Sequence, residues 1–290
     1  MKIPLYGAVP TTHTQQLLSY PLPISKTLPA YVRGSSDVRK ALEGKVMVVT
    51  GASDGIGKQI ALLSAELGAK VALVARRKEL LGKIEEEITA KGGVAMAVPA
   101  DITWYNPTTR EYETFKAAIN QVVERYGPID YLVNNAGIFK DPKFTDMKTE
   151  LIHDMVELNL TAALAGTKYA LQHFSEDGVV LNMSSHVTLR HFADEEVYNA
   201  TKAALNEFTL TLNESHGRMV AYALMPGAIN TEIIRSKEKE WAPFVHEKTG
   251  MAWQDYLKKI LQPEQVAAAA INIMATKPST ALIVQESVTF

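Results

Sequence analysis

The chain has 290 residues, of which 47% are hydrophobic and 21% charged, with a formal net charge of -2 at pH 7 and no cysteine. This balance is typical of an ordinary globular protein and gives no global electrostatic reason to expect nucleic acid or a membrane as partner. The lack of cysteine excludes a thiolate nucleophile and a thiol metal site, and no apolar run approaches the roughly 20 residues that span a bilayer or resembles a secretory signal, so we expect a metal-free cytoplasmic protein.

Residues 1–44 differ from the rest of the chain. They carry prolines at positions 4, 10, 21, 23 and 29 and show no sustained helical or strand period. Two interpretations stay open: an N-terminal arm that wraps the domain or a neighbouring subunit, and a disordered tail. The segment also offers apolar side chains that a purely solvated tail would not need: Leu17, Leu18, Tyr20, Leu22 and Tyr31.

From Lys45 onward, short β-branched runs alternate with amphipathic helical stretches, the pattern of repeated βαβ units. Strands are expected at Val46–Thr50, Val71–Val74, Val94–Val98, Tyr131–Asn134, Val179–Met183, Met219–Leu224 and Ala281–Val284. Helices are expected near 56–67, 77–91, 111–126, 148–174, 197–215 and 263–275. Right-handed crossovers then place helices on both faces of one doubly wound, Rossmann-type α/β sheet of about seven strands, in a single domain of residues 45–290.

The first expected strand leads directly into a glycine-rich turn, Thr50–Gly57, and then into a helix. Glycines allow a tight turn and close approach of a phosphate, while the helix N-terminus supplies free N–H groups and partial positive charge. A glycine-rich turn without a ligand is the alternative. The strand before the turn and the helix after it favour nucleotide binding.

The end of the second strand bears on which dinucleotide binds. A carboxylate there would hold the ribose 2'-hydroxyl of NAD and repel a 2'-phosphate, but the sequence is Val74-Ala75-Arg76-Arg77. NADP(H) is therefore expected in preference to NAD(H), with Arg76 as the main phosphate ligand and Ser53 or Arg77 assisting. The alternative is that both arginines only begin a solvated helix.

Tyr198 and Lys202 lie four residues apart on an expected helix that follows the pair Ser184-Ser185. The two side chains share a helix face, so the ammonium can lie near the phenol. An unperturbed tyrosine has a pKa of about 10, and nearby positive charge lowers it toward the range useful for proton transfer. A tyrosine and a lysine four residues apart are common in helices. The spacing points to catalysis only together with the serine pair before it and the other motifs of the chain.

With these motifs the chain resembles a short-chain dehydrogenase/reductase of the classical type, over roughly residues 45–290. The resemblance depends on the ordered motifs Thr50–Gly57, Asp101-Ile102, Asn134-Asn135-Ala136-Gly137, Asn159, Ser184-Ser185, Tyr198 with Lys202, and Pro226-Gly227 followed by Thr231. It implies catalytic roles for Asn159, Ser185, Tyr198 and Lys202. It implies a cofactor site built from Gly51, Ser53, Asp54, Gly55, Ile56, Gly57, Arg76, Arg77, Asp101, Ile102, Asn135, Ala136, Gly137, Tyr198, Lys202, Pro226, Gly227, Ile229 and Thr231.

The resemblance also implies a role for each group. Tyr198 would exchange a proton with the substrate oxygen while Ser185 hydrogen-bonds that oxygen, and Lys202 would grip the nicotinamide ribose. Asn159 would hold a water that connects Lys202 to a proton relay. Asp101 and Ile102 would lie beside the adenine, and Ile229 and Thr231 would contact the carboxamide.

The implied function is NADP(H)-dependent reduction of a small-molecule ketone or aldehyde to an alcohol, or the reverse. The competing hypothesis is a catalytically silent NADP(H)-sensing or scaffold protein, which would not need the whole catalytic set. An epimerase or dehydratase of the extended branch is disfavoured by the glycine spacing. A carrier-bound 3-oxoacyl thioester ranks below a free ketone, because Asn213–His216 carries little positive charge to attract an acidic carrier.

Three features concern the substrate and the partners. A substrate lid is expected at about 231–261, with aromatic residues that either line the pocket or pack the lid: Trp241, Phe244, Trp253 and Tyr256. The segment His186–His191 is more polar than the family often shows, and it either contacts a polar substrate group or only caps a loop. In relatives the helices that correspond to 148–174 and 197–215 often form contacts between subunits, so the resemblance implies a homotetramer or homodimer. The missing Asp-Gly-Gly close near Phe290 departs from the family pattern.

Overall fold

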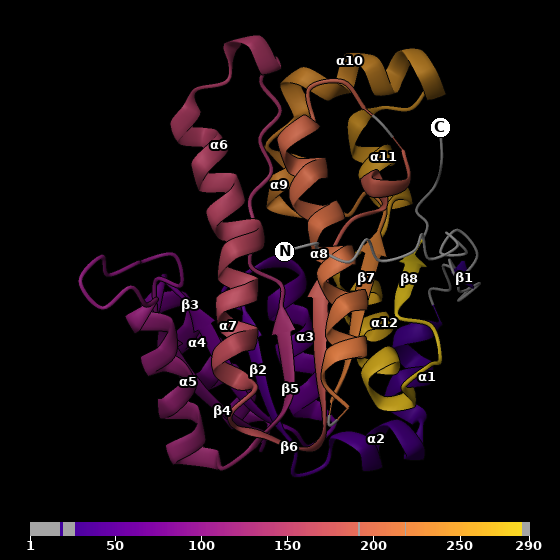
Figure 1. Ribbon diagram of the computed structural model, residues 1–290. Helices are drawn as coiled ribbons and strands as arrows, with labels where there is room; N and C mark the ends of the chain where they lie inside the picture. The colour runs from indigo at the N-terminus through magenta and orange to yellow at the C-terminus, as the bar shows by residue number, and fades with distance from the viewer. Residues whose placement is uncertain (1–17, 20–26, 191, 218, 286–290) are drawn as a thin grey trace, which may run out of the picture.

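The computed structural model describes residues 18–19, 27–190, 192–217 and 219–285. They form one parallel sheet of eight strands in the order β1-β8-β7-β6-β5-β2-β3-β4 (Figure 1). The strands are β1 (Leu18–Ser19), β2 (Val46–Thr50), β3 (Lys70–Ala75), β4 (Val94–Pro99), β5 (Ile129–Asn134), β6 (Phe174–Met183), β7 (Met219–Pro226) and β8 (Leu282–Gln285). The seven expected strands and the Rossmann-type fold are confirmed, and β1 adds a short strand beside β8.

Helices cover both faces of the sheet (Figure 1). The apolar core on one face includes Ile60, Leu81 and Ile271, and the core on the other face includes Phe115 and Ala162. The first layer is formed by α3 (Gly55–Glu66), α4 (Lys78–Ala90) and α12 (Pro263–Thr276), and the second by α5 (Glu113–Tyr126), α7 (Ala162–Ala170) and α8 (Glu196–Ser215). Because central strands are buried on both sides, they are almost continuously apolar, which made them visible in the sequence.

The expected helix over 148–174 is divided into three parts. Helix α6 (Thr149–Val156) continues into a π-helical turn, Glu157–Thr161, and then into α7, while β6 already begins at Phe174. An apolar period does not reveal a π turn, since one extra residue in the ring leaves the helix axis nearly unchanged. Such turns often mark functional sites, and this one contains Asn159.

Two short helices precede the first long strand. They are α1 (Leu28–Gly34) and α2 (Ser36–Leu42), which the sequence did not predict because seven residues are too few to display a period. Buried side chains such as Val32 and Leu42 join the core beside α3 and α12. Of the apolar residues noted in the sequence, Tyr31 is 59% exposed. Leu17, Tyr20, Leu22 and the side chain of Leu18 lie outside the described part of the chain.

The segment between β7 and α12 contains α9 (Glu232–Arg235), α10 (Glu238–Thr249) and α11 (Trp253–Lys259). It has an apolar cluster of its own, which includes Val245, Trp253 and Tyr256 and is distinct from the two cores that flank the sheet. We call this segment the lid. Trp253 and Tyr256 therefore pack the lid internally, whereas Phe244 is 53% exposed.

Two broader features of the described residues concern function. No helix among them is long and apolar enough to cross a membrane. Within the same residues, no group of three or more histidine, aspartate or glutamate side chains is arranged to hold a metal ion.

Candidate functional site

The site lies where the strand order reverses. Strand β2 pairs with β3 on one side and with β5 on the other, so the turns after β2 and β5 open the crevice that binds ligands in doubly wound folds. The glycine-rich turn follows β2 and Asn135–Gly137 follows β5. The sequence motifs of the two halves therefore meet at one edge of the sheet.

The glycine-rich turn has the close backbone packing expected of a phosphate cradle. Gly51 has φ +66°, and a Cβ built on Gly57 would lie 2.5 Å from both Gly51 O and Asn135 Nδ2. The carboxylate of Asp54 caps α3, accepting a hydrogen bond from Gly55 N at 2.7 Å. Any larger residue at position 57 would therefore collide with the turn itself and with Asn135.

Thr50 joins the two turns. Its hydroxyl accepts hydrogen bonds from the backbone N–H groups of Asn135 at 3.0 Å and Ala136 at 3.1 Å, and donates to Val133 O at 3.2 Å. The side-chain amide of Asn135 donates back to Thr50 O at 2.9 Å. These bonds fix the cofactor-facing ends of β2 and β5 relative to each other.

One member of the basic pair after β3 contacts the glycine-rich turn. The Arg77 guanidinium donates to Ser53 Oγ from Nε at 3.1 Å and from Nη2 at 2.8 Å, so Arg77 lies against the glycine-rich turn. Arg76 is exposed at the strand tip. Asp101 follows β4, where its carboxylate accepts hydrogen bonds from Thr103, and Ile102 is buried beside it.

Asn159 is fixed by the backbone of Ile138. Its Oδ1 accepts from Ile138 N and its Nδ2 donates to Ile138 O, both at 2.8 Å. The side chain is 1% exposed. A Cβ built on Gly137 would lie 3.1 Å from Asn159 Oδ1 and 3.6 Å from Lys202 Nζ, so the end of β5, the π turn and α8 converge here.

Ser185, Tyr198 and Lys202 form the polar centre of the site. Ser185 ends the loop after β6 and hydrogen-bonds the Tyr198 phenol. Lys202 lies one helical turn after Tyr198, with Nζ 5.6 Å from the centre of the tyrosine ring and donating to Met183 O at 2.7 Å. The structure brings these three side chains together.

Burial controls the ionisation of this pair. Burial raises the pKa of Tyr198 to about 12, opposed by the hydrogen bond from Ser185. Burial also lowers the pKa of Lys202 to about 8, since a charged ammonium loses its hydration inside the protein. Without further positive charge beside it, the phenol therefore holds its proton firmly.

The segment after β7 closes the other side of the crevice. Gly227 N donates to Gln285 O at 2.8 Å, and buried Ile229 forms a β-bridge with Leu261 at the end of the lid. The methyl group of Thr231 would lie 3.6 Å from a Cβ built on Gly55. Thr231 thus faces the start of α3, while Pro226 ends the strand.

The polar segment after Ser185 forms a short 3-10 helix, His186–Leu189. Thr188 Oγ1 donates to Ser185 O at 3.0 Å and Asn199 Nδ2 donates to Val187 O at 2.9 Å. Polar groups of this segment therefore order the loop itself. His191 lies outside the described residues.

Sequence reasoning missed a group of residues above Tyr198. The Phe139 ring meets the Tyr198 ring edge to face, with centroids 4.9 Å apart, and Trp241 of the lid packs on Phe139 at 6.1 Å. Lys237, between α9 and α10, forms an ion pair with Asp141. No spacing in the sequence links these positions, because the contacts form only when the lid folds over β5.

Comparisons with known proteins agree with this geometry. A family model described as short chain dehydrogenase matches residues 45–242. An uncharacterized oxidoreductase from Listeria monocytogenes is 33% identical over 201 residues, covering 67% of this chain and 78% of the relative. A 3-oxoacyl-[acyl-carrier-protein] reductase from Vibrio cholerae is 32% identical over 250 residues, covering 85% and 95%.

Solved structures show the same similarity. A short chain dehydrogenase from Burkholderia cenocepacia, crystallised in complex with NADP, superposes with a TM-score of 0.74 at 26% identity. The match covers 85% of this chain and 98% of that one. The residues before position 45 lie outside the matched family model.

Proposed function

Because the chain belongs to the short chain dehydrogenase family, we propose that it is an NADP(H)-dependent oxidoreductase that reduces the carbonyl of a small ketone or aldehyde to an alcohol, or catalyses the reverse. The observation that carries the proposal is the convergence of Ser185, Tyr198 and Lys202 beside Gly137. A proton donor, a second hydrogen-bond donor and a cation there face one crevice, as carbonyl reduction requires.

The residues present fit a nicotinamide dinucleotide. At Gly51 and Gly57 the turn before α3 packs so closely on Asn135 and Ala136 that a Cβ would collide with them, and Thr231 faces the start of the same helix. Gly51–Gly57 would hold the pyrophosphate, Asp101 and Ile102 the adenine, and Asn135–Gly137, Lys202 and Pro226–Thr231 the nicotinamide half. When bound, the cofactor supplies or accepts a hydride.

The chain's own residues handle the proton. In reduction, Tyr198 gives its hydroxyl proton to the substrate oxygen while Ser185 donates a hydrogen bond to the same atom. Lys202 places positive charge beside the resulting phenolate and lowers the pKa of Tyr198 once a cofactor adds its own charge. Asn159, held by Ile138, positions the residues through which the phenolate is reprotonated.

The experiment that tests the function is NADPH oxidation, followed by absorbance, against ketones, aldehydes, keto-sugars and 3-oxoacyl thioesters. Turnover with at least one carbonyl is expected. Tight NADPH binding with no turnover on any compound would instead favour the silent cofactor-sensing protein. Failure to bind either dinucleotide would contradict the cofactor assignment.

NADP preference is proposed to come from the two arginines after β3. Hydrogen bonds to charged groups contribute about 1.5–3 kcal/mol each, so Arg76→Ala/Arg77→Ala should weaken NADPH binding by at least about 100-fold and leave NADH binding nearly unchanged. Fluorescence titration with both dinucleotides measures this. The single variants show which arginine contributes more, a point on which the contact between Arg77 and Ser53 favours Arg77.

The matched control is Lys78→Ala, which removes the next exposed cation at the start of α4. It should leave both affinities unchanged. Equal losses for NADH and NADPH in the double arginine variant would mean that the arginines only order the turn, and would contradict the preference.

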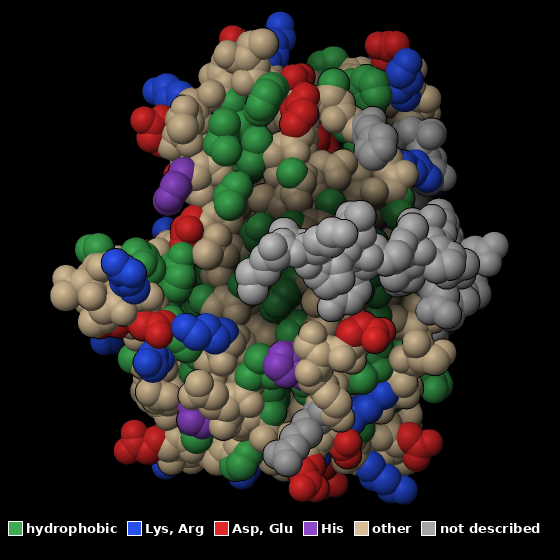
Figure 2. Space-filling view, in the orientation of Figure 1, with side chains coloured by type: hydrophobic (Ala, Val, Ile, Leu, Met, Phe, Trp, Pro, Cys, Tyr) green, Lys and Arg blue, Asp and Glu red, His purple; other side chains and the backbone are tan. Residues whose placement is uncertain are grey.

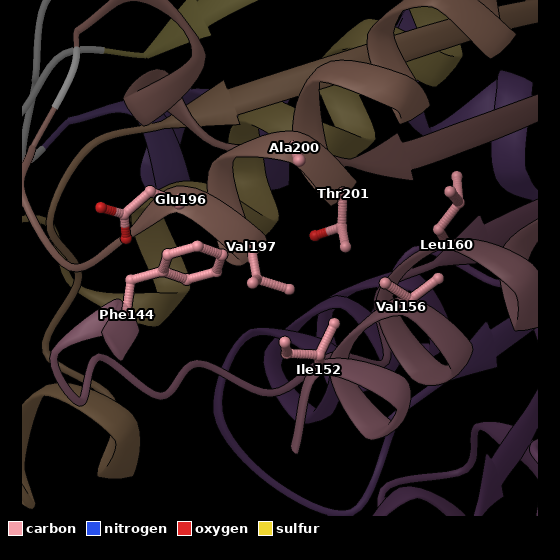
Figure 3. A pocket seen from close by; sticks show the side chains of 8 residues that line it. All are labelled: Phe144, Ile152, Val156, Leu160, Glu196, Val197, Ala200 and Thr201. Atoms are coloured by element: carbon pink, nitrogen blue, oxygen red, sulfur yellow. The ribbon is translucent and has the colours of Figure 1, made fainter. Parts of the chain in front are cut away.

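We also propose that the chain is a homodimer or homotetramer. An apolar groove of about 350 Å³ lies between α6 and α8, lined by side chains such as Ile152, Val156 and Val197, with Phe144 at its end (Figure 3). Hydrophobic side chains gather on this face of the molecule, between α6 and the upper part of α8 (Figure 2). Such a patch is typical of an interface between copies.

Sedimentation tests the assembly. Val156→Glu places a charge in the groove, so the variant is expected to sediment as a monomer at concentrations at which the unmodified protein sediments as a dimer or larger species. Monomeric behaviour of the unmodified chain would contradict the proposal. The cytoplasmic location stays a prediction from the sequence.

The division of the chain is also proposed: an N-terminal extension, 1–44, and a catalytic domain, 45–290, whose lid covers about 231–261. The beginning of the family match at residue 45 and the separate apolar cluster of the lid support this division.

A further inference from the structure

Glu195 occupies the position directly before α8, three residues ahead of Tyr198. Its Oε2 atom is buried and has no hydrogen-bond partner among the described residues. The negative charge of Asp141, a residue that follows β5, raises the pKa of Glu195. The negative charge of Glu195 in turn raises the pKa of Tyr198. A carboxylate is thus held beside the catalytic phenol without the partners that a structural glutamate usually has.

The lid holds the other side of this arrangement. Lys237 pairs with Asp141 and donates to Glu240 at 2.9 Å, and the side chains of Asp141 and Lys237 are only 10% and 12% exposed. Trp241, one helical turn further along the lid, packs on Phe139, which packs on Tyr198. The ion pair and the ring contacts therefore attach the lid to the segment after β5 and, through Phe139, to Tyr198.

We propose that Glu195 is a positioning residue of the proposed reaction: a carboxylate at the start of α8, three residues before Tyr198, that acts on the phenol through its charge. The inference rests on the proposed function, because it concerns the proton that Tyr198 transfers. Glu195 does not itself need to touch substrate or cofactor.

The electrostatics of the pocket support the proposal. Burial, and after it the charge of Asp141, raises the pKa of Glu195 to about 7, so that it changes charge near neutral pH. Ionised Glu195 raises the pKa of Tyr198. Further charges contact Tyr198 and Asp141: Lys202 Nζ lies 5.6 Å from the centre of the Tyr198 ring, and Lys237, which pairs with Asp141, also pairs with Glu240.

These two pKa shifts give the direction in which the charge of Glu195 changes the pH dependence of the reaction. Above about pH 7 Glu195 is ionised and Tyr198 holds its proton more firmly, which opposes the base form needed for alcohol oxidation. Removing the charge should therefore lower the pKa of Tyr198 and move the rising limb of the oxidation profile to lower pH. A residue that only supported the fold would change the rate without moving the limb.

The test is a pH titration of the NADP⁺ complex of the full chain, with tyrosine labelled with ¹³C at Cζ and the Tyr198 signal assigned by its loss in Tyr198→Phe. Glu195→Gln is expected to lower the Tyr198 midpoint by at least about half a pH unit. Glu195→Asp retains a carboxylate, so its Tyr198 midpoint should lie close to that of the unmodified protein. The pH profile of kcat/KM for alcohol oxidation should move by the same amount.

Glu196→Gln is the matched control. Glu196 is the next residue and is exposed, at the edge of the apolar groove between α6 and α8 (Figure 3). It should leave the midpoint unchanged. Equal Tyr198 midpoints in Glu195→Gln and the unmodified protein would overturn the inference whether or not a substrate is known. A shifted midpoint in a protein that turns over no carbonyl would uphold the inference and contradict the proposed function.

Discussion

Tyr198→Phe is expected to lower kcat for carbonyl reduction by about 10³-fold, within the range that a positioned general acid contributes. The variant removes only the hydroxyl that Ser185 hydrogen-bonds, and the ring that packs on Phe139 stays in place. NADPH binding should therefore change little. Steady-state kinetics and fluorescence titration of NADPH separate the two effects.

A matched control for this substitution lies on β7. Tyr222 is buried and donates from its hydroxyl to Pro278 O at 3.0 Å, far along the sheet from the crevice. Tyr222→Phe should retain full activity and lose only the modest stability of one hydrogen bond, about 1 kcal/mol. If Tyr198→Phe kept more than a tenth of the unmodified rate, the proton would have to come from another group.

Lys202→Met is expected to affect activity and stability in opposite directions. It removes the cation beside the phenol, so kcat should fall by about 10²–10³-fold, and the optimum pH for oxidation should rise because the pKa of Tyr198 rises. It also removes a buried ammonium. Among the described residues this ammonium contacts Met183 O and the Tyr198 ring, and neither is a carboxylate.

The stability gain can be estimated from the lowered pKa of Lys202. A folded-state value of about 8 against an ordinary 10.5 means that the charged form destabilises the native state by on the order of 3 kcal/mol at neutral pH. Loss of the bond to Met183 O offsets about 1 kcal/mol of this. We therefore expect the cofactor-free variant to be about 1–2 kcal/mol more stable than the unmodified protein at pH 7, measured by urea unfolding.

The pH dependence of the free energy of unfolding tests whether the Lys202 ammonium destabilises the fold. Between pH 8 and about 10 the unfolded chain keeps a proton on Lys202 that the folded chain has lost, so the unmodified protein gains stability as pH rises. Lys202→Met lacks this gain, and the difference between the two proteins should shrink across the window. A constant difference, or a variant less stable at pH 7, would show that the ammonium is not destabilising the fold.

Local patterns account for the part of the site that the sequence could predict. The glycine-rich turn and the pair Tyr198 and Lys202 depend on residues near one another in the chain, and the sheet topology then brings the two together. The contact of Arg77 with Ser53 depends on side-chain direction after β3, which sequence spacing does not give. The sequence therefore does not show which of Arg76 and Arg77 contributes more to binding the 2'-phosphate.

Contacts distant in sequence account for what could not be predicted. Lys237 pairs with Asp141 across 96 positions, and the burial of Glu195 likewise depends on the folded chain around it. The π turn at Asn159 was hidden within a helical period, and α1 and α2 were too short to show one. In each case the deciding interaction is tertiary, and no pattern along the chain reports it.

The position of α1 has a consequence for the order in which the molecule can fold during synthesis. Arg33 pairs with Glu264 on α12 at 2.7 Å, a contact between residues 231 positions apart, and α1 packs mainly on that late helix. Helix α1 is therefore synthesised long before α12, the helix on which it mainly packs. Closing so long a loop is slow, so the N-terminal helices should dock in a late step of folding.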